Sequence, residues 1–268
     1  MSKKALKRSI VFAILWMLLL AVSLTSATYA WFTFVSSTKS TPMYGKVSGD
    51  GVNLLISNNP NGPFDKTCAL ILTYDTQEIT PVTTADLTNF FLPRLQDKDG
   101  IPRVYSRIEG RVDTYLLHGT VYIKAEESGC FVYLADGLLD FGNDVQAIAS
   151  MRLGLSIRSS QGTQNIIFRL DDFMDTTAAL SRQTVEQSGT VYNGLGMVAD
   201  PATDLSAYMA YGEEDNLRAG GQPLFWINAD EVVPVEYWLY LEGCDDNCYN
   251  AVQTRDVALS LGFGGIER

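Results

Sequence analysis

The sequence predicts an all-β protein, an antiparallel β-sandwich of jelly-roll type with a partly helical insertion. Three observations support this prediction. Hydrophobic and polar residues alternate with a period of two in several segments, as in strands with one buried and one solvent-facing side. The 13 tyrosines and 12 phenylalanines favour strands. Long runs of Ala, Glu, Lys and Leu, which build helices, are missing.

The strands of this fold are expected between residues 51 and 268. The clearest alternation occurs in four segments, 112–126, 151–158, 235–243 and 256–263. Shorter hydrophobic segments lie at 52–57, 68–73, 130–135 and 165–170. Roughly nine strands separated by turn residues favour one β-sandwich domain over residues 51–268. No alternation of strands with helices is visible, which argues against a Rossmann-type domain.

Residues 172–225 differ from the rest of this domain. They contain the stretches MDTTAALSRQTVEQSG and DPATDLSAYMAYGEEDN and several glycines. We expect an insertion at about 172–225 with one or two short helices, one of them capped by Asp200 or Thr203. A loop of this length is often functional, but it can also be decoration.

The N-terminus has the order of an export signal. Basic residues at 3–8 precede an apolar run from Ile10 to Val22, and small residues follow. A run of this length suits a signal peptide and is short for a membrane-spanning helix. We therefore expect residues 1–30 to be removed after Ala30, with Ala27 as the alternative, and the rest of the chain to be extracellular or at the cell surface.

A retained membrane anchor is the alternative. No charge occurs between Arg8 and Lys39. A helix could therefore continue past residue 22, with Tyr29, Trp31 and Phe32 at the membrane interface. In that case residues 10–32 would contact the membrane.

Cleavage after Ala30 would leave the mature chain with an unusual start. Residues 31–50 form a short aromatic segment followed by a polar arm rich in Ser, Thr, Gly and Pro. The apolar side chains of the segment are Trp31, Phe32, Phe34 and Val35. The segment could pair within its own sheet, or it could add as a strand to the sheet of a neighbouring molecule. Repeated head to tail, the second arrangement builds a filament.

Four cysteines suit an oxidising compartment. Cys244 and Cys248 are close enough in sequence for a loop disulfide, and Cys68 and Cys130 would then form a long-range one. Free buried thiols are the alternative. A zinc site has little support, because His118 is the single histidine of the chain and no second closely spaced cysteine pair exists.

The charge of the chain excludes one class of partner. The formal net charge is −11, and residues 1–30 hold four of the 20 basic residues and no acidic one. The remaining 16 basic and 31 acidic residues give −15. Nucleic acid binding is therefore not expected, since it depends on Lys and Arg meeting phosphate. Asp245 and Asp246, or the acidic residues at 213–215, are weak candidates for calcium; neither has the spacing of an EF-hand loop.

Catalysis has little support, and we expect no enzyme. His118 lies on the polar face of its strand, where an ordinary exposed histidine is expected rather than a member of a catalytic triad. The fingerprints G-x-S-x-G, H-E-x-x-H and G-x-x-x-x-G-K-[ST] are absent. Acidic clusters at 170–172 and 212–216 could in principle supply paired carboxylates for sugar hydrolysis, but solvated turns explain them equally well.

Several stretches resemble a broad group of secreted proteins from Gram-positive bacteria. They are SATYAWFTF at 26–34, LLIS at 54–57, WLYLEGCDDNC at 238–248 and VALSLGF at 257–263. The export region is similar to that of the TasA/camelysin group of biofilm-matrix proteins. This resemblance implies a jelly-roll fold, assembly into fibres through an N-terminal donor strand, and processing by a dedicated signal peptidase. It covers the N-terminus and about the last 35 residues.

The expected function is therefore structural: a secreted protein of the cell surface or extracellular matrix that self-associates through residues 31–36. The alternative is an extracellular binding module for glycan or protein on a retained membrane anchor, with exposed Trp226 or Trp238 as its platform. A secreted hydrolase ranks last. No cofactor motif is found.

Overall fold

The computed structural model describes residues 16–17, 43–73, 79–96, 102–142, 144–170, 190–191, 197–198, 202–212, 216–243, 245, 248 and 258–267. The chain divides into two compact units, Met1–Val35 and Ser36–Arg268. Of the first unit, only Trp16 and Met17 are described; they are helical and exposed. All elements below belong to the second unit.

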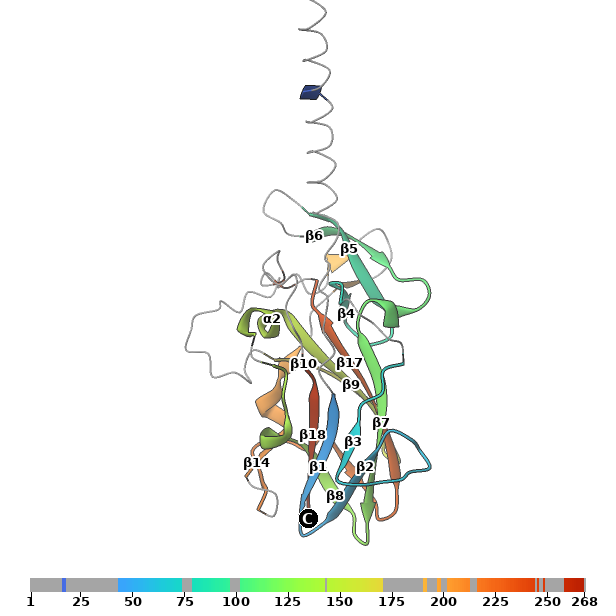
Figure 1. The fold of residues 1–268 in the computed structure, drawn as a ribbon, viewed down its shortest axis with the longest axis vertical. Helices are drawn as coiled ribbons and strands as arrows, with labels where there is room; N and C mark the ends of the chain where they lie inside the picture. The colour runs from blue at the N-terminus through green and yellow to red at the C-terminus, as the bar shows by residue number, and fades with distance from the viewer. Residues whose placement is uncertain are drawn as a thin grey trace, which may run out of the picture. The chain divides into compact units, whose positions relative to one another are not determined.

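The first large sheet has the strand order β15-β14-β8-β18-β1-β3, and β16 pairs with β8 beside this path. Its strands are β1 (Tyr44–Asp50), β3 (Thr67–Ala69), β8 (Cys130–Ala135), β14 (Met209–Tyr211), β15 (Arg218–Ala219), β16 (Phe225–Ile227) and β18 (Ser260–Ile266). The sheet is mixed, because β1 pairs with β18 in parallel, as does β14 with β8. The first and last of these strands along the chain thus lie side by side (Figure 1).

The second large sheet has the order β13-β10-β9-β17-β7-β2. Its strands are β2 (Asn53–Ser57), β7 (Leu117–Glu126), β9 (Met151–Ser159), β10 (Gly162–Arg169), β13 (Thr203–Asp204) and β17 (Val232–Leu241). All pairs are antiparallel except β10 with β13. The tight β9–β10 hairpin pairs Ser159 with Gly162, whose φ of +124° needs glycine.

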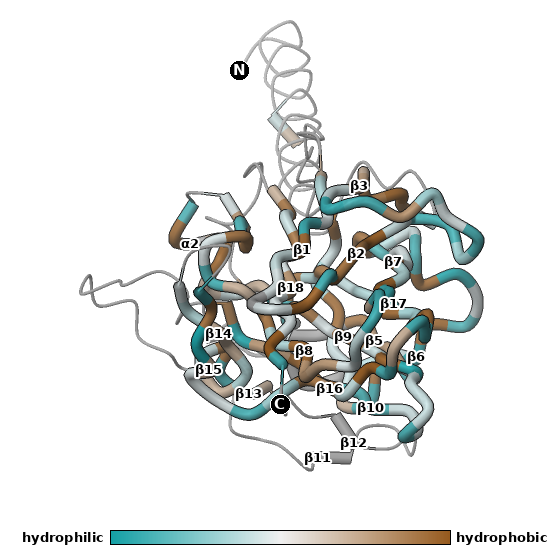
Figure 2. Tube along the Cα trace, turned by 90° about the horizontal axis from the view of Figure 1, so that it is seen from below, coloured by the Kyte–Doolittle hydropathy of each residue, from teal (hydrophilic) through white to brown (hydrophobic). Residues whose placement is uncertain are grey.

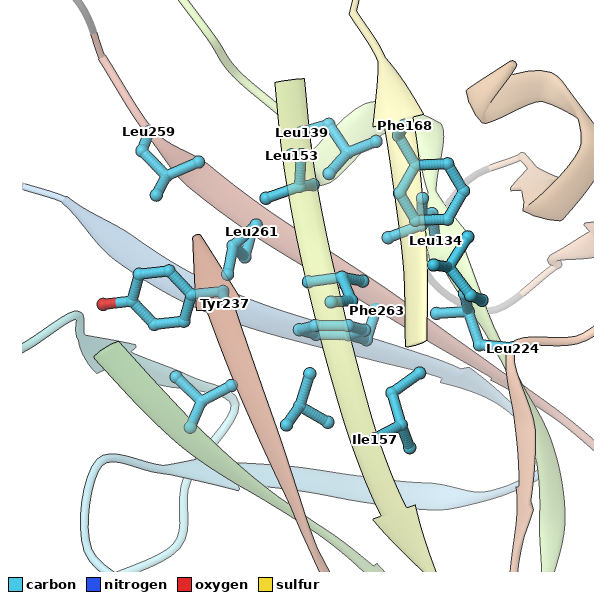
Figure 3. Packing of buried hydrophobic residues seen from close by; sticks show 14 of the residues in the cluster. Leu134, Leu139, Leu153, Ile157, Phe168, Leu224, Tyr237, Leu259, Leu261 and Phe263 are labelled. Carbon is cyan, nitrogen blue, oxygen red and sulfur yellow. The ribbon is translucent and has the colours of Figure 1, made fainter. Parts of the chain in front are cut away.

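The two sheets share one hydrophobic core. Leu134, Leu261 and Phe263 of the first sheet and Leu153 and Tyr237 of the second belong to the same cluster of buried side chains. Figure 3 shows side chains from both sheets pointing toward one another. In the view of Figure 2, β1 and β18 lie on one side of this core and β7 and β17 on the other. The alternation in the sequence therefore reflects inward-facing side chains on both sheets.

A third, three-stranded sheet covers the outer face of the second large sheet. It consists of β4 (Thr83–Thr84), β5 (Phe90–Gln96) and β6 (Pro102–Arg107). A second hydrophobic cluster joins Phe90 and Leu87 of this layer to Trp238 and Tyr240 of β17. Gly154 on β9 makes the close approach possible, since a Cβ there would lie 2.4 Å from Cδ2 of Leu87. The middle of the second sheet is thus buried on both faces.

Short elements complete the described part of the chain. They are α2 (Val145–Ser150), the 3₁₀ helices η1 (Val112–Thr114), η2 (Asp136–Leu138) and η3 (Leu205–Tyr208), and the hairpin β11 (Thr190–Val191) with β12 (Met197–Val198). Two segments cross between the large sheets. Residues 67–73 leave β3 and bridge to β7 at Gly119, and residues 203–211 run from β13 through η3 to β14.

The all-β fold class is confirmed, and β2, β7–β10, β17 and β18 coincide with predicted strands. The expectation that residues 31–50 form an arm is wrong for 44–50, which form an inner strand despite their Gly, Ser and Lys content. The predicted insertion at about 172–225 supplies strands to both large sheets between 203 and 225, and Leu205 is fully buried there. Among the described residues of the insertion, the helical element is the 3₁₀ turn η3, whose N-cap Asp204 makes no side-chain cap hydrogen bond. Of the two predicted caps, Thr203 lies in β13 and Asp200 lies outside the described residues.

Candidate functional site

The densest cluster of titratable groups surrounds His118. Its Nδ1 lies 2.7 Å from Oδ1 of Asp113, and its Nε2 lies 2.9 Å from Oε1 of Glu236. The other carboxylate oxygen of Glu236 accepts a hydrogen bond from Arg158 at 2.5 Å. We call these four residues the His118 clamp. Asp113 and His118 come from the consecutive elements η1 and β7, whereas Arg158 on β9 and Glu236 on β17 are distant from them in the sequence.

Strand register positions the clamp. Trp238 is the direct cross-strand partner of His118, and the two rings stack with centroids 4.9 Å apart and an interplanar angle of 5°. Glu236 lies two residues before Trp238 and therefore on the same face of the sheet. The ring of His118 is held from the side by two carboxylates and from below by an indole. Its side chain is 13% exposed.

The electrostatics of the clamp favour the charged imidazolium. Burial opposes the charge, but the hydrogen bonds to Glu236 and Asp113 outweigh it, so the pKa of His118 is raised above its ordinary value. The hydrogen bond from His118 is in turn the largest cause that lowers the pKa of Glu236, and Arg158 adds to this effect. A neutral imidazole has one N–H donor, so only the imidazolium can donate to both carboxylates.

This arrangement limits what His118 can do chemically. Both ring nitrogens are engaged by carboxylates, which leaves no lone pair for a metal ion or for the proton of a nucleophile. The prediction that His118 is not part of a triad remains a prediction, while the expectation of an ordinary exposed histidine is wrong. The segment that carries Asp113 partly covers the face of the second sheet on which His118 lies.

A second candidate site is a groove of about 590 Å³ on the outer face of the first sheet. Lys46, Ser48 and Thr67 line it along β1 and β3, and Leu138 and Leu217 line its opposite side. Because Val47 and its partner Phe263 face the core, Lys46 and Ser48 face outward. This volume is within the range of small-molecule sites.

Two glycines of β18 shape the groove. A Cβ at Gly262 would lie 2.3 Å from Cβ of Leu138, and a Cβ at Gly264 would lie 2.9 Å from Cδ1 of Leu217. The missing side chains let both leucines lie directly on the sheet. In the sequence, Gly262 was visible only as one of the small residues that alternate with apolar ones in the predicted strand 256–263, and Gly264 lies just beyond that strand. The leucines that contact them could not be predicted.

The predicted long-range disulfide is absent. Cys68 and Cys130 are free thiols in the structure. Cys68 is on β3 and Cys130 on β8, and β18 and β1 lie between them. Three strand spacings separate the two by about 14 Å, whereas the Cα atoms of a disulfide are roughly 4.4–6.8 Å apart. Cys248 is half-buried and Cys244 lies outside the described residues, so the loop disulfide stays a prediction.

The weak calcium candidate Asp245 has another role. Its carboxylate is 2% exposed and pairs with the fully buried Arg152 at 2.5 Å. A carboxylate held by a buried guanidinium is not available to a cation. Asp246 and residues 213–215 lie outside the described residues. Within the described segments, no group of three or more His, Cys, Asp or Glu side chains could hold a metal ion.

The two tryptophans proposed as a platform are not exposed. Trp238 is buried between His118 and Phe90 of the outer layer. Trp226 is half-buried against Phe131, and its Nε1 donates a hydrogen bond to Asn228. Trp238 lies on the face of its strand that the alternation marks as polar, but the third sheet covers that face. The prediction that Trp238 is exposed is therefore wrong.

The predicted export signal, the membrane-contact residues 10–32 and the assembly residues Trp31, Phe32, Phe34 and Val35 lie outside the described residues, apart from Trp16 and Met17. The same holds for Asp171 and Asp172 of the 170–172 acidic cluster. The described part of the chain contains no helix that is long and apolar enough to span a membrane.

Comparison with known proteins adds no assignment. No family model matches the chain, and neither the curated proteins nor the solved structures contain a significant match.

Proposed function

We propose that this chain is a secreted or surface-displayed structural protein whose two large sheets form a β-sandwich and whose copies join through residues 31–36. The shared core of the two sheets supports the sandwich. The parallel pairs β1–β18 and β14–β8 depart from the all-antiparallel pattern of a jelly roll. The resemblance of the export region to TasA/camelysin proteins supports the same function.

One observation carries the assembly proposal. The chain divides after Val35, so the aromatic segment does not belong to the compact unit that holds the sheets. Eight residues, 36–43, connect it to β1, an inner strand paired on both sides. A connection of this length reaches at most about 26–29 Å when extended. The segment could therefore reach the sheet of a neighbouring copy, where backbone hydrogen bonds and pockets for its aromatic side chains would hold it.

The test compares two triple variants of the full chain. In the first, Trp31, Phe32 and Phe34 are changed to Ser; in the matched control, Ser37, Thr38 and Ser40 are changed to Ala. Intact mass and N-terminal sequencing of protein from cells and medium establish where each chain begins. Negative-stain microscopy of the same samples then scores filaments.

We expect wild type and control to begin at Trp31 or Thr28 and to form filaments, and the aromatic variant to form none. Filaments that persist without the three aromatic side chains would disprove the assembly mechanism. A chain that retains Ile10–Val22, stays in membranes and forms no filaments would favour the retained anchor instead.

The groove favours a second candidate function, binding of an acidic glycan at the cell surface. Among the described residues, no carboxylate pairs with the ammonium of Lys46, although the chain as a whole is strongly acidic. The hydroxyl of Thr67 and the amide of Asn216 add hydrogen-bonding groups. This combination suits a sugar that carries a carboxylate.

Titration with oligogalacturonate and with a neutral oligosaccharide of equal length tests this candidate. Lys46→Gln should weaken binding of the acidic sugar about tenfold or more and leave the neutral one unaffected, since a charge-assisted hydrogen bond is lost. Lys124→Gln, on the other large sheet, is the control. Equal binding of both sugars, or no effect of Lys46→Gln, would eliminate the groove as an acidic-glycan site.

A further inference from the structure

We propose that the His118 clamp is a pH-sensitive device that holds the segment 108–116 most tightly against the second sheet while the ring carries a proton on both nitrogens. This segment connects β6 of the outer layer to β7. Asp113 is its charged contact with the ring. The inference is independent of the proposed assembly and of the groove.

The geometry connects the clamp to the outer layer. Ile108, Val112, Tyr115 and Leu116 of the segment pack in the same hydrophobic cluster as Phe90 of β5. The amide of Ile108 donates a hydrogen bond to the carbonyl of Phe90. A weaker contact between His118 and Asp113 should therefore loosen the edge of the third sheet, which covers Trp238.

Few groups face the imidazole. From η1 it meets Asp113, and from β17 it meets Glu236 and the ring of Trp238. Arg158 of β9 reaches it through Glu236. On its own strand, Lys124 is paired with Glu126 and Asp230. Two carboxylates thus lie at hydrogen-bond distance from the ring, and Arg158 pairs with the second of them.

Loss of one proton changes this balance. A neutral ring keeps one N–H and turns a lone pair toward the other carboxylate, which repels it. Glu236 also pairs with Arg158, and it does not belong to the segment. The described contacts of the ring hold the segment through Asp113. Deprotonation therefore removes the attraction between the charged ring and the Asp113 carboxylate, which weakens the hold on the segment.

The direction of the pH effect follows from the raised pKa of His118 in the folded protein. The stabilisation is fully present below the ordinary histidine pKa of about 6.5 and is lost as the pH rises through the higher folded value. Between these two values, opening of the segment should increase about tenfold for each pH unit. The segment is thus held most tightly below pH 6.5 and less tightly once the pH exceeds the midpoint of His118 in the folded protein.

Nitrogen NMR of the full chain measures the clamp directly, since His118 is its single histidine. We expect both ring nitrogens to be protonated at pH 6.5, with a titration midpoint above 6.5. Asp113→Asn and Glu236→Gln should each lower the midpoint. Glu126→Gln, a carboxylate exchange at the exposed end of β7, should leave it unchanged. A wild-type midpoint at or below 6.5 would overturn the inference.

Hydrogen exchange measures the consequence. Protection factors of amides 108–116, relative to those of Val132–Leu134 in β8, should fall through the His118 midpoint in wild type. In His118→Gln they should be low at every pH and independent of it. Protection in the segment that does not change with pH in wild type would show a purely structural histidine and disprove the device. Glu236→Gln allows the same hydrogen-exchange test in a variant that keeps the imidazole ring of His118.

Discussion

Arg152 shows how single residues depart from the simple pattern of a half-buried strand. The sequence places it on the polar face of its strand, but its guanidinium is fully buried. It donates hydrogen bonds to the carbonyls of Ala149 and Met151 and pairs with Asp245. A buried charge of this kind is tolerated only with a partner, because the cost of leaving water is several kcal/mol per ion.

Removing one partner of this pair should therefore cost more than removing both. We expect Asp245→Asn to lower the free energy of unfolding by about 3–5 kcal/mol, and the double variant Arg152→Met/Asp245→Leu to lower it by less. Lys124→Ala breaks a more exposed pair and should cost less than Asp245→Asn. Urea unfolding followed by tryptophan fluorescence gives all three values. A loss for Asp245→Asn no larger than that for Lys124→Ala would contradict this account.

At the scale of elements, the third sheet decides which strand faces are buried. Trp238, Tyr240 and Gly154 lie on faces that the alternation marks as solvent-facing, and the outer layer covers them. Leu87 reaches Gly154 from a backbone with a φ of 58°, which is unusual for leucine. Hydrogen bonds from the amides of Asp86 and Leu87 to the hydroxyl of Thr84 help to hold this turn.

A double-mutant cycle tests the contact between these layers. Gly154→Ala introduces a Cβ too close to Leu87, so it should lower the free energy of unfolding by about 1–3 kcal/mol. Leu87→Ala alone leaves a cavity and should cost about 2–5 kcal/mol. The double variant should lose less than the sum, because the added methyl occupies space that leucine vacates. Strict additivity would show that the two residues do not touch.

The sequence predicted the strands whose alternation is regular, such as 151–158 and 235–243, because one face of each lies in the shared core. It did not predict β1, since Gly45 and Lys46 resemble a linker and its burial comes from neighbours far along the chain. It also missed the His118 clamp. Asp113 was visible only as an interruption of an apolar face, and the pairing of His118 with Trp238 depends on a register that no local pattern encodes.

For the molecule as a whole, strand order determines the chemistry of the cysteines. Burial raises the pKa of Cys68 to about 11 and that of Cys130 to about 12. At pH 8 the reactive thiolate is thus rare at both sites. The position of each residue within the first sheet keeps the two apart.

We therefore expect Cys68 and Cys130 to react with iodoacetamide at pH 8 only after unfolding, and peptide mapping without reductant to find no bridge between them. Mass spectrometry of native and urea-treated chain measures both. Rapid native labelling of either residue, or a Cys68–Cys130 peptide pair, would contradict the strand order. The same map reports whether Cys244 and Cys248 are joined.

The parallel pairing of β1 with β18 also constrains when the chain can fold. One of these strands is complete by residue 50, and the other does not exist until residue 266 has been synthesised. Until then β18, which lies between β8 and β1 in the sheet, is missing, and the shared core cannot close. Contacts at such sequence separation form slowly. During synthesis the shared core therefore cannot close before residue 266 has emerged, and until then the unpaired strands are open to proteolysis.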